Sequence, residues 1–263
     1  MKTIEKSILK NQKLPTRVFN NYKIGSKWVA EEMANLILQK QHQKKNCILG
    51  LSTGSSPKEV YKELIKMHKE NGLSFKNVIT FNLDEYYPMK PHEQQSYVSF
   101  MKNNLFNHID IPCQNINIPD GTLPSNDVND YCKAYENKIQ SLGGIDLQLL
   151  GIGRTGHIGF NEPGSGFNSI TRLISLDNIT IKDAVIDFNS VKNVPKQAIT
   201  MGVNTIMQAK RIFLMAWGAK KATIIKKTIE NNLSDTIPAT YLQKHKNIEV
   251  IMDSEASKKL NSK

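Results

Sequence analysis

The sequence predicts an α/β fold with a largely parallel sheet, formed as a single domain by residues 1–263. Two observations support this prediction. Apolar runs of strand length alternate with segments whose apolar residues recur at helical spacing, and three predicted strands lead directly into loops rich in glycine or polar residues. Strands joined through helices run parallel, with right-handed crossovers. The length also allows two small domains, but no linker or repeat divides the chain.

The first elements form a helix–strand–helix unit. Residues 26–40 are predicted to form a helix, because apolar residues recur there at intervals of three and four behind an N-cap at Ser26. Residues 47–51 are an apolar run of strand length. A second helix is expected next, with Ser56 as its N-cap and Pro57 as its first residue, where proline is favoured.

The alternation continues through the rest of the chain. It predicts strands at 77–83, 145–150, 211–217 and 247–252, and helices at 97–106, 128–142 and 219–230. In sheets of this kind, ligands bind outside the carboxyl ends of the strands. We therefore expect the functional residues in the loops that begin at Ser52, Asp84 and Gly151.

Charge and hydropathy restrict the class of partner. The chain carries 35 Lys and Arg residues against 24 Asp and Glu residues, a formal net charge of +11. These basic residues are dispersed, without the basic block typical of a nucleic-acid site, so an anionic metabolite is the expected partner. No apolar run approaches the roughly 18 residues that a membrane span requires, so no membrane partner is expected.

Cysteine usage and the first residues predict the compartment. Cys47, Cys113 and Cys132 are widely spaced, which indicates neither a disulfide framework nor a zinc site. Residues 1–10 lack the apolar stretch of a secretory signal. A cytoplasmic protein without a metal site is therefore expected.

The first loop, residues 50–57, is a candidate anion site. It follows a predicted strand and precedes a helix, whose free amides and dipole favour an anion. Its clustered hydroxyl groups can donate hydrogen bonds to a phosphate monoester, although an ordinary strand-to-helix turn has a similar composition. The loop lacks the lysine of a nucleotide-binding P-loop.

The second loop contains adjacent carboxylates at Asp84 and Glu85, directly after a predicted strand. Successive side chains of an extended segment point in opposite directions, so we expect one of them to face the pocket. A carboxylate beside a phosphate loop can abstract a proton from a carbon next to a carbonyl or imine. The alternative is a solvated acidic turn.

The third loop, residues 151–166, has the highest density of candidate residues. It contains a literal G-x-G-x-x-G pattern, but a dinucleotide site would require that run to open a helix, and the following glycines and proline oppose one. His157 and Glu162 are a candidate acid–base pair, although a lone histidine is more often structural.

The motifs in these loops resemble those of the glucosamine-6-phosphate deaminase (isomerase) family. The resemblance extends over residues 18–253 and includes the segments 52–57, 81–86, 156–163, 194–202 and 217–222. It implies a Rossmann-like α/β sandwich without a dinucleotide site, no metal or organic cofactor, and a homo-oligomer. The implied reaction converts glucosamine 6-phosphate and water to fructose 6-phosphate and ammonia.

The resemblance also implies residue roles. Asp84 would move the proton between C2 and C1, and His157 would open the pyranose ring with Glu162 positioning it. The expected catalytic residues are Asp84, Thr155, His157 and Glu162, and the expected substrate- or phosphate-binding residues are Ser52, Thr53, Gly54, Ser55, Ser56, Gly153, Arg154, Arg172 and Lys221.

Two departures from the family pattern concern the same site. The family commonly has an acidic residue two positions before the histidine, where this chain has Thr155. Its lid segment commonly offers an arginine to the phosphate, whereas residues 177–188 contain only Lys182 as a cation. An isomerase or lactonase acting on another phosphorylated sugar, or a silent sugar-phosphate-binding paralogue, are therefore alternative functions.

Overall fold

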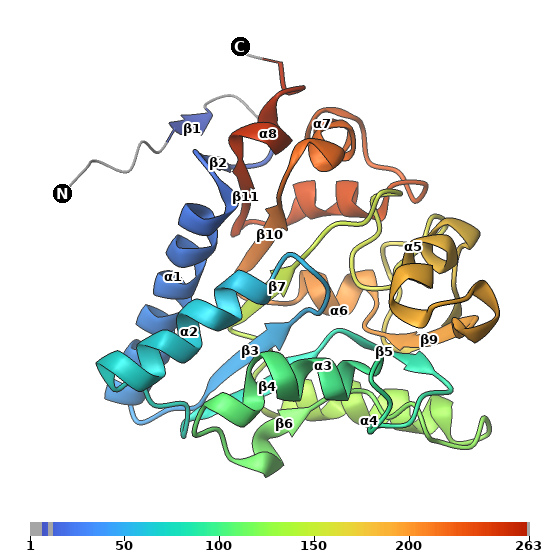
Figure 1. Ribbon diagram of the computed structural model, residues 1–263, viewed down its shortest axis with the longest axis horizontal. Coiled ribbons are helices and arrows are strands. Elements are labelled where there is room, and N and C mark those ends of the chain that lie inside the picture. Colours follow the sequence, from blue (N-terminus) through green and yellow to red (C-terminus); the bar gives the residue numbers. More distant parts are fainter. Residues whose placement is uncertain (1–6, 10–12, 262–263) are drawn as a thin grey trace.

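The main sheet of the computed structural model, which describes residues 7–9 and 13–261, has eight strands, of which seven are parallel (Figure 1). Its strand order is β1-β2-β11-β10-β7-β3-β4-β6, and only β1 is antiparallel to its neighbour within the described residues. The strands are β1 (Ser7–Leu9), β2 (Thr16–Phe19), β3 (Cys47–Leu51), β4 (Val78–Asn82), β6 (Ile116–Asn117), β7 (Leu147–Leu150), β10 (Ile212–Ala216) and β11 (Ile248–Asp253). The predicted α/β fold with a largely parallel sheet is confirmed.

Helices cover both faces of this sheet. They are α1 (Tyr22–His42), α2 (Lys58–Asn71), α3 (Tyr97–Asn104), α4 (Val128–Ser141), α5 (Asn178–Phe188), α6 (Val203–Met207), α7 (Ala222–Glu230) and α8 (Ser254–Ser257). Alternate strand residues enter opposite cores: Phe213 and Met215 pack with α1 to α3, whereas Leu214 packs with α4, α6 and α7. This alternation is the period of two that an extended strand imposes.

Two predicted helix caps are wrong. Helix α1 begins at Tyr22, with the Asn21 side chain accepting a hydrogen bond from the Ile24 amide at 3.1 Å, so Ser26 lies buried inside the helix. Helix α2 begins at Lys58 with no side-chain cap. Helix α1 does have a side-chain N-cap, but the capping residue is Asn21 and not Ser26.

A second, smaller sheet was not expected from the sequence. It has three antiparallel strands in the order β5 (Asp84–Tyr87), β9 (Gln197–Thr200) and β8 (Arg172–Ser175). Leu83 joins the two sheets, because its amide donates to the Leu51 carbonyl and its carbonyl accepts from the Met201 amide. The chain therefore passes from the carboxyl end of β4 straight into β5, which fixes the position of Asp84.

No helix in the described part of the chain has the length and apolar character to cross a membrane.

Candidate active site

Four neighbouring parallel strands place the candidate residues in one cavity. Strands β10, β7, β3 and β4 lie side by side, so the loops that follow them emerge at the same edge of the sheet. The cavity there measures about 270 Å³. Its walls include the three loops expected from the sequence, a fourth loop that follows β10, and one side of α5. The polar and glycine residues that line it include Ser52, Thr53, Gly54, Ser55, Ser56, Asp84, Gly151, Gly153, Arg154, His157, Thr180, Asp183, Asp187 and Lys221.

Aromatic side chains hold the hydroxyl-rich loop in place. The Tyr61 hydroxyl donates to the Ser52 carbonyl at 2.5 Å, and the Trp217 indole donates to the Ser56 carbonyl at 3.1 Å. The Ser52 hydroxyl is buried and has no hydrogen-bond partner among the described residues. A buried polar atom that faces a cavity without a partner is satisfied when a ligand supplies one.

Asp84 and Glu85 separate as the extended backbone predicts. Asp84 lines the cavity, whereas the Glu85 carboxylate turns away and accepts hydrogen bonds from the Tyr97 and Val98 amides at the start of α3. It also accepts from the Tyr86 amide. Glu85 is therefore a structural carboxylate, and Asp84 alone of the pair can reach a ligand.

Burial makes the Asp84 carboxyl an unusually weak acid. It raises the pKa of Asp84 from 3.8 to about 8, the Glu85 charge adds to the rise, and a hydrogen bond from the Phe160 amide opposes it. A carboxylate with a raised pKa is a stronger base than an ordinary one. Gly159 allows this arrangement, since a β-carbon there would lie 3.2 Å from an Asp84 carboxylate oxygen.

We predict that Asp84→Asn has a higher free energy of unfolding than the wild type at high pH. Between the unfolded value near 3.8 and the folded pKa of about 8, the unfolded chain has lost the proton that the folded chain retains. Stability due to this group is therefore lost as the pH rises through that window. The variant should gain on the order of a few kcal/mol over the wild type at pH 9, and little at pH 4. Urea unfolding at both pH values measures the difference, and an equal gain at both would contradict the shifted pKa.

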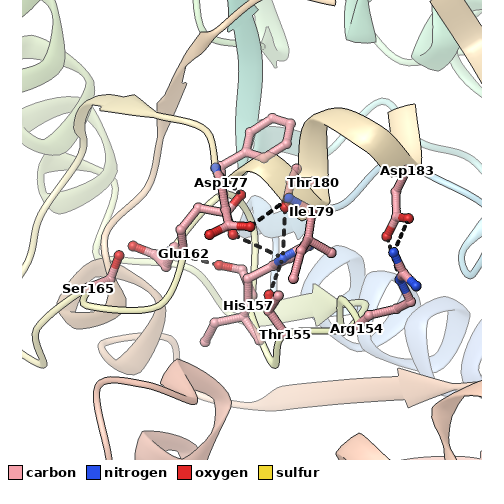
Figure 2. A network of polar contacts seen from close by, with 12 residues as sticks. Arg154, Thr155, His157, Glu162, Ser165, Asp177, Ile179, Thr180 and Asp183 are labelled. Carbon is pink, nitrogen blue, oxygen red and sulfur yellow. Dashed lines mark hydrogen bonds and ion pairs between the residues drawn. The ribbon is translucent and has the colours of Figure 1, made fainter. Parts of the chain in front are cut away.

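Three oxygen atoms surround one nitrogen of His157, as Figure 2 shows. The His157 Nδ1 lies 3.0 Å from the Thr155 hydroxyl, 3.3 Å from a Glu162 carboxylate oxygen and 3.5 Å from the Thr180 hydroxyl. The other ring edge packs against Gly153, where a β-carbon would fall 2.1 Å from the imidazole. The histidine is thus oriented from both sides.

Thr155 and Glu162 contact His157 but do not line the cavity. The expectation that Thr155 and Glu162 take part in catalysis stays a prediction, and their contacts favour a role exerted through His157. They are placed to position His157. The Glu162 carboxylate is buried, and the oxygen facing the ring has no hydrogen-bond partner in the described part of the chain.

Lys221 and Arg154 bring positive charge to the cavity. The Lys221 ammonium donates to the Ile152 carbonyl at 2.6 Å, and burial lowers its pKa. The Arg154 guanidinium forms two hydrogen bonds to the Asp183 carboxylate of α5, at 2.8 and 2.5 Å (Figure 2). Both residues lie where the sequence predicted an anion site.

Arg172 is the exception among the expected substrate-binding residues. It lies in β8, outside the cavity lining, and its guanidinium donates to the Asn161 side chain and the Ser165 hydroxyl, both at 3.0 Å. These contacts hold the loop after His157 against the second sheet. The structure does not bring Arg172 to the cavity wall, and the expected contact between Arg172 and a phosphate stays a prediction.

The sequence analysis missed the contribution of α5. Thr180, Asp183 and Asp187 project from one face of this helix into the cavity. Their spacing of three and four residues is a usable signal, but the weak amphipathic pattern of residues 177–188 gave no reason to place them near His157. Within the described residues, no group of three or more His, Cys, Asp or Glu side chains could hold a metal ion.

The glycine pattern after β7 does not build a dinucleotide site. Turns follow Gly151, Gly153 and Gly156, and the chain next enters regular structure at β8. The pattern instead brings the Gly153 backbone close to the His157 imidazole.

Comparison with known proteins places this arrangement in a family. Residues 25–252 match the model for glucosamine-6-phosphate isomerases/6-phosphogluconolactonase. The chain belongs to this family. It is 45% identical to a glucosamine-6-phosphate deaminase of Clostridium novyi, covering 88% of this chain and 95% of that protein. It is 49% identical to a putative glucosamine-6-phosphate deaminase-like protein of Bacteroides thetaiotaomicron, of which it spans 39%.

Solved structures of family members agree with the fold. A monomeric glucosamine-6-phosphate deaminase superposes with a TM-score of 0.88 at 39% identity, covering 93% of this chain and 99% of that one. A 6-phosphogluconolactonase from Trypanosoma brucei superposes with a TM-score of 0.75 at 20% identity. The second likeness concerns the fold alone.

Proposed function

We propose that this family member converts glucosamine 6-phosphate and water to fructose 6-phosphate and ammonia. The observation that carries the proposal is the shared cavity, in which the buried Asp84 carboxylate and the positioned His157 face the same space as the hydroxyl loop and Lys221. The identity of about 45% to named deaminases over most of the chain supports the choice of reaction.

Different residues of the cavity bind the phosphate, open the sugar ring and transfer the proton. Residues 52–56 and Lys221 hold the phosphate, through hydroxyl donors and one positive charge. His157 opens the pyranose ring by accepting the proton of the C1 hydroxyl and delivering a proton to the ring oxygen as the C1–O5 bond breaks. Asp84, in its ionised form, then moves the proton from C2 to C1 through an enolamine. Water adds to the resulting C2 iminium, and ammonia leaves from that carbon.

Ammonia release tests this proposal directly. Glucosamine 6-phosphate should yield ammonia, whereas N-acetylglucosamine 6-phosphate should not, because its amide cannot act as the leaving amine of this reaction. Hydrolysis of a 6-phosphosugar lactone without ammonia release would favour the lactonase alternative. Binding without turnover of either would favour a silent sugar-phosphate-binding protein.

We predict that Lys221→Ala mainly weakens substrate binding. A charge-assisted hydrogen bond contributes roughly 1.5–3 kcal/mol, so KM should rise about tenfold to a hundredfold. Lys220→Ala is the matched control, because Lys220 is exposed and lies outside the cavity lining. Steady-state kinetics of both variants decide the assignment, and an equal loss in both would indicate a diffuse field instead of a specific contact.

Cytoplasmic location and homo-oligomeric assembly stay predictions. The dispersed cysteines and the small anionic substrate favour the first. The solved relative is described as monomeric, so light scattering of the purified protein is the direct measurement of the second.

A further inference from the structure

The Arg154–Asp183 ion pair lies inside the substrate cavity, not at a remote surface. Both side chains line the cavity, and about half of each is exposed, at 56% and 46%. Arg154 comes from the loop that carries His157, and Asp183 comes from α5 on the opposite side (Figure 2). The two hydrogen bonds between them use the guanidinium fork that also suits a phosphate.

Lys221 lies close to the loop that carries Arg154, because its ammonium donates to the carbonyl of Ile152, two residues before Arg154. The charges of Asp183 and Arg154 act on the Lys221 ammonium in opposite directions, which places all three groups within electrostatic reach. The Asp183 carboxylate therefore neutralises part of the positive charge that the proposed phosphate site offers. It occupies donors of Arg154 that a phosphate would otherwise use.

We propose that Asp183 sets the affinity of the cavity for phosphate, because it competes with the substrate phosphate for the Arg154 guanidinium. The inference rests on the proposed function, since it takes the Lys221 end of the cavity as the phosphate end. When phosphate binds, Arg154 exchanges the carboxylate of α5 for the phosphate oxygens. Asp183 thus weakens phosphate binding and ties α5 to the catalytic loop in the empty enzyme.

Thr180 gives this exchange a consequence for catalysis. It lies one turn before Asp183 on α5 and contacts the His157 Nδ1 at 3.5 Å. Within the described residues, the ion pair and this contact are the side-chain hydrogen bonds that join α5 to the loop of residues 154–157. Release of Asp183 leaves the Thr180 contact with the histidine in place, while Ala184 and Phe188 keep α5 packed against Phe160.

Inorganic phosphate is the probe that tests the proposal. Calorimetric titration at low ionic strength should show Asp183→Asn binding phosphate about threefold to tenfold more tightly than the wild type, and Arg154→Gln binding it more weakly. High salt should reduce the gain, because the side chains are half exposed. Asp187→Asn is the matched control, since it removes the same charge one turn further along α5 from a residue that also lines the cavity. It should change the affinity less than twofold.

Nuclear magnetic resonance of the arginine Nε groups supplies a second readout. The chain has four arginines, namely Arg17, Arg154, Arg172 and Arg211. The signal that disappears in Arg154→Lys is that of Arg154. Phosphate should shift the Arg154 signal and leave that of Arg17 unchanged. In Asp183→Asn the signal should already be displaced before phosphate is added.

Unchanged or weaker phosphate binding by Asp183→Asn would overturn the proposal, and so would equal tightening by Asp187→Asn. These results are distinguishable from failure of the proposed function. An enzyme that releases ammonia but shows no Asp183 effect loses only this inference. A protein that shows the effect but releases no ammonia loses only the reaction.

Discussion

Asp84→Asn is expected to lower kcat by roughly 10²–10⁴-fold while substrate binding survives, because the amide keeps the shape of the carboxyl group and loses its basicity. In the wild type, kcat/KM should rise with pH along an acid limb well above the usual carboxyl range, since burial raises the pKa of Asp84 to about 8. The variant should lose that limb. Initial rates between pH 5 and 9 measure both effects.

Glu85→Gln is the matched control for Asp84. Its carboxylate turns away from the cavity and caps α3, so the variant should lose stability more than turnover. Wild-type exchange of the C2 proton with solvent deuterium in Asp84→Asn would contradict the assignment of Asp84 as the base.

Glu162→Gln is expected to lower kcat by roughly 10²-fold or more, with little change in KM. Glu162 supplies the negative charge beside the His157 Nδ1, whereas the other two oxygens near that nitrogen belong to neutral threonines. An imidazole that gains a proton during ring opening therefore depends on this carboxylate. The effect should appear in kcat because Glu162 does not touch the cavity.

Variants at Thr155 separate charge from hydrogen bonding at the same nitrogen. Thr155→Val removes one neutral hydrogen bond and should cost roughly 2- to 12-fold in kcat, from about 0.5–1.5 kcal/mol. Thr155→Asp restores a carboxylate at the position where the family commonly has one, and should raise turnover if the loop keeps its conformation in a crystal structure. Equal losses in Glu162→Gln and Thr155→Val would show that charge is not the deciding property.

The main sheet and the site edge were predictable from local patterns. Strands such as β3 and β10 are continuous apolar runs, which is typical of strands buried on both faces. The expected loops met in one cavity because parallel strands share one carboxyl edge. The alternation of side chains also indicated that a single carboxylate of the Asp84–Glu85 pair would face a ligand.

The parts that escaped prediction depend on contacts between distant segments. Strand β8 is a half-buried strand of four residues, too short for a periodic signal. Helix α5 packs through Ala184 and Phe188 on residues distant in sequence and also contacts Arg154 and His157, and local residue patterns do not identify such partners. Arg172 was expected to bind substrate or phosphate, and the sequence carries no sign that its guanidinium donates to Asn161 and Ser165.

The most direct test of the proposed reaction is a paired assay of ammonia and fructose 6-phosphate, with glucosamine 6-phosphate given to the wild type and to Asp84→Asn in parallel. The wild type should form the two products in equal amounts, and the variant should form both at a rate reduced by roughly 10²-fold or more. Fructose 6-phosphate without ammonia, ammonia without fructose 6-phosphate, or equal rates in the two proteins would contradict the proposal.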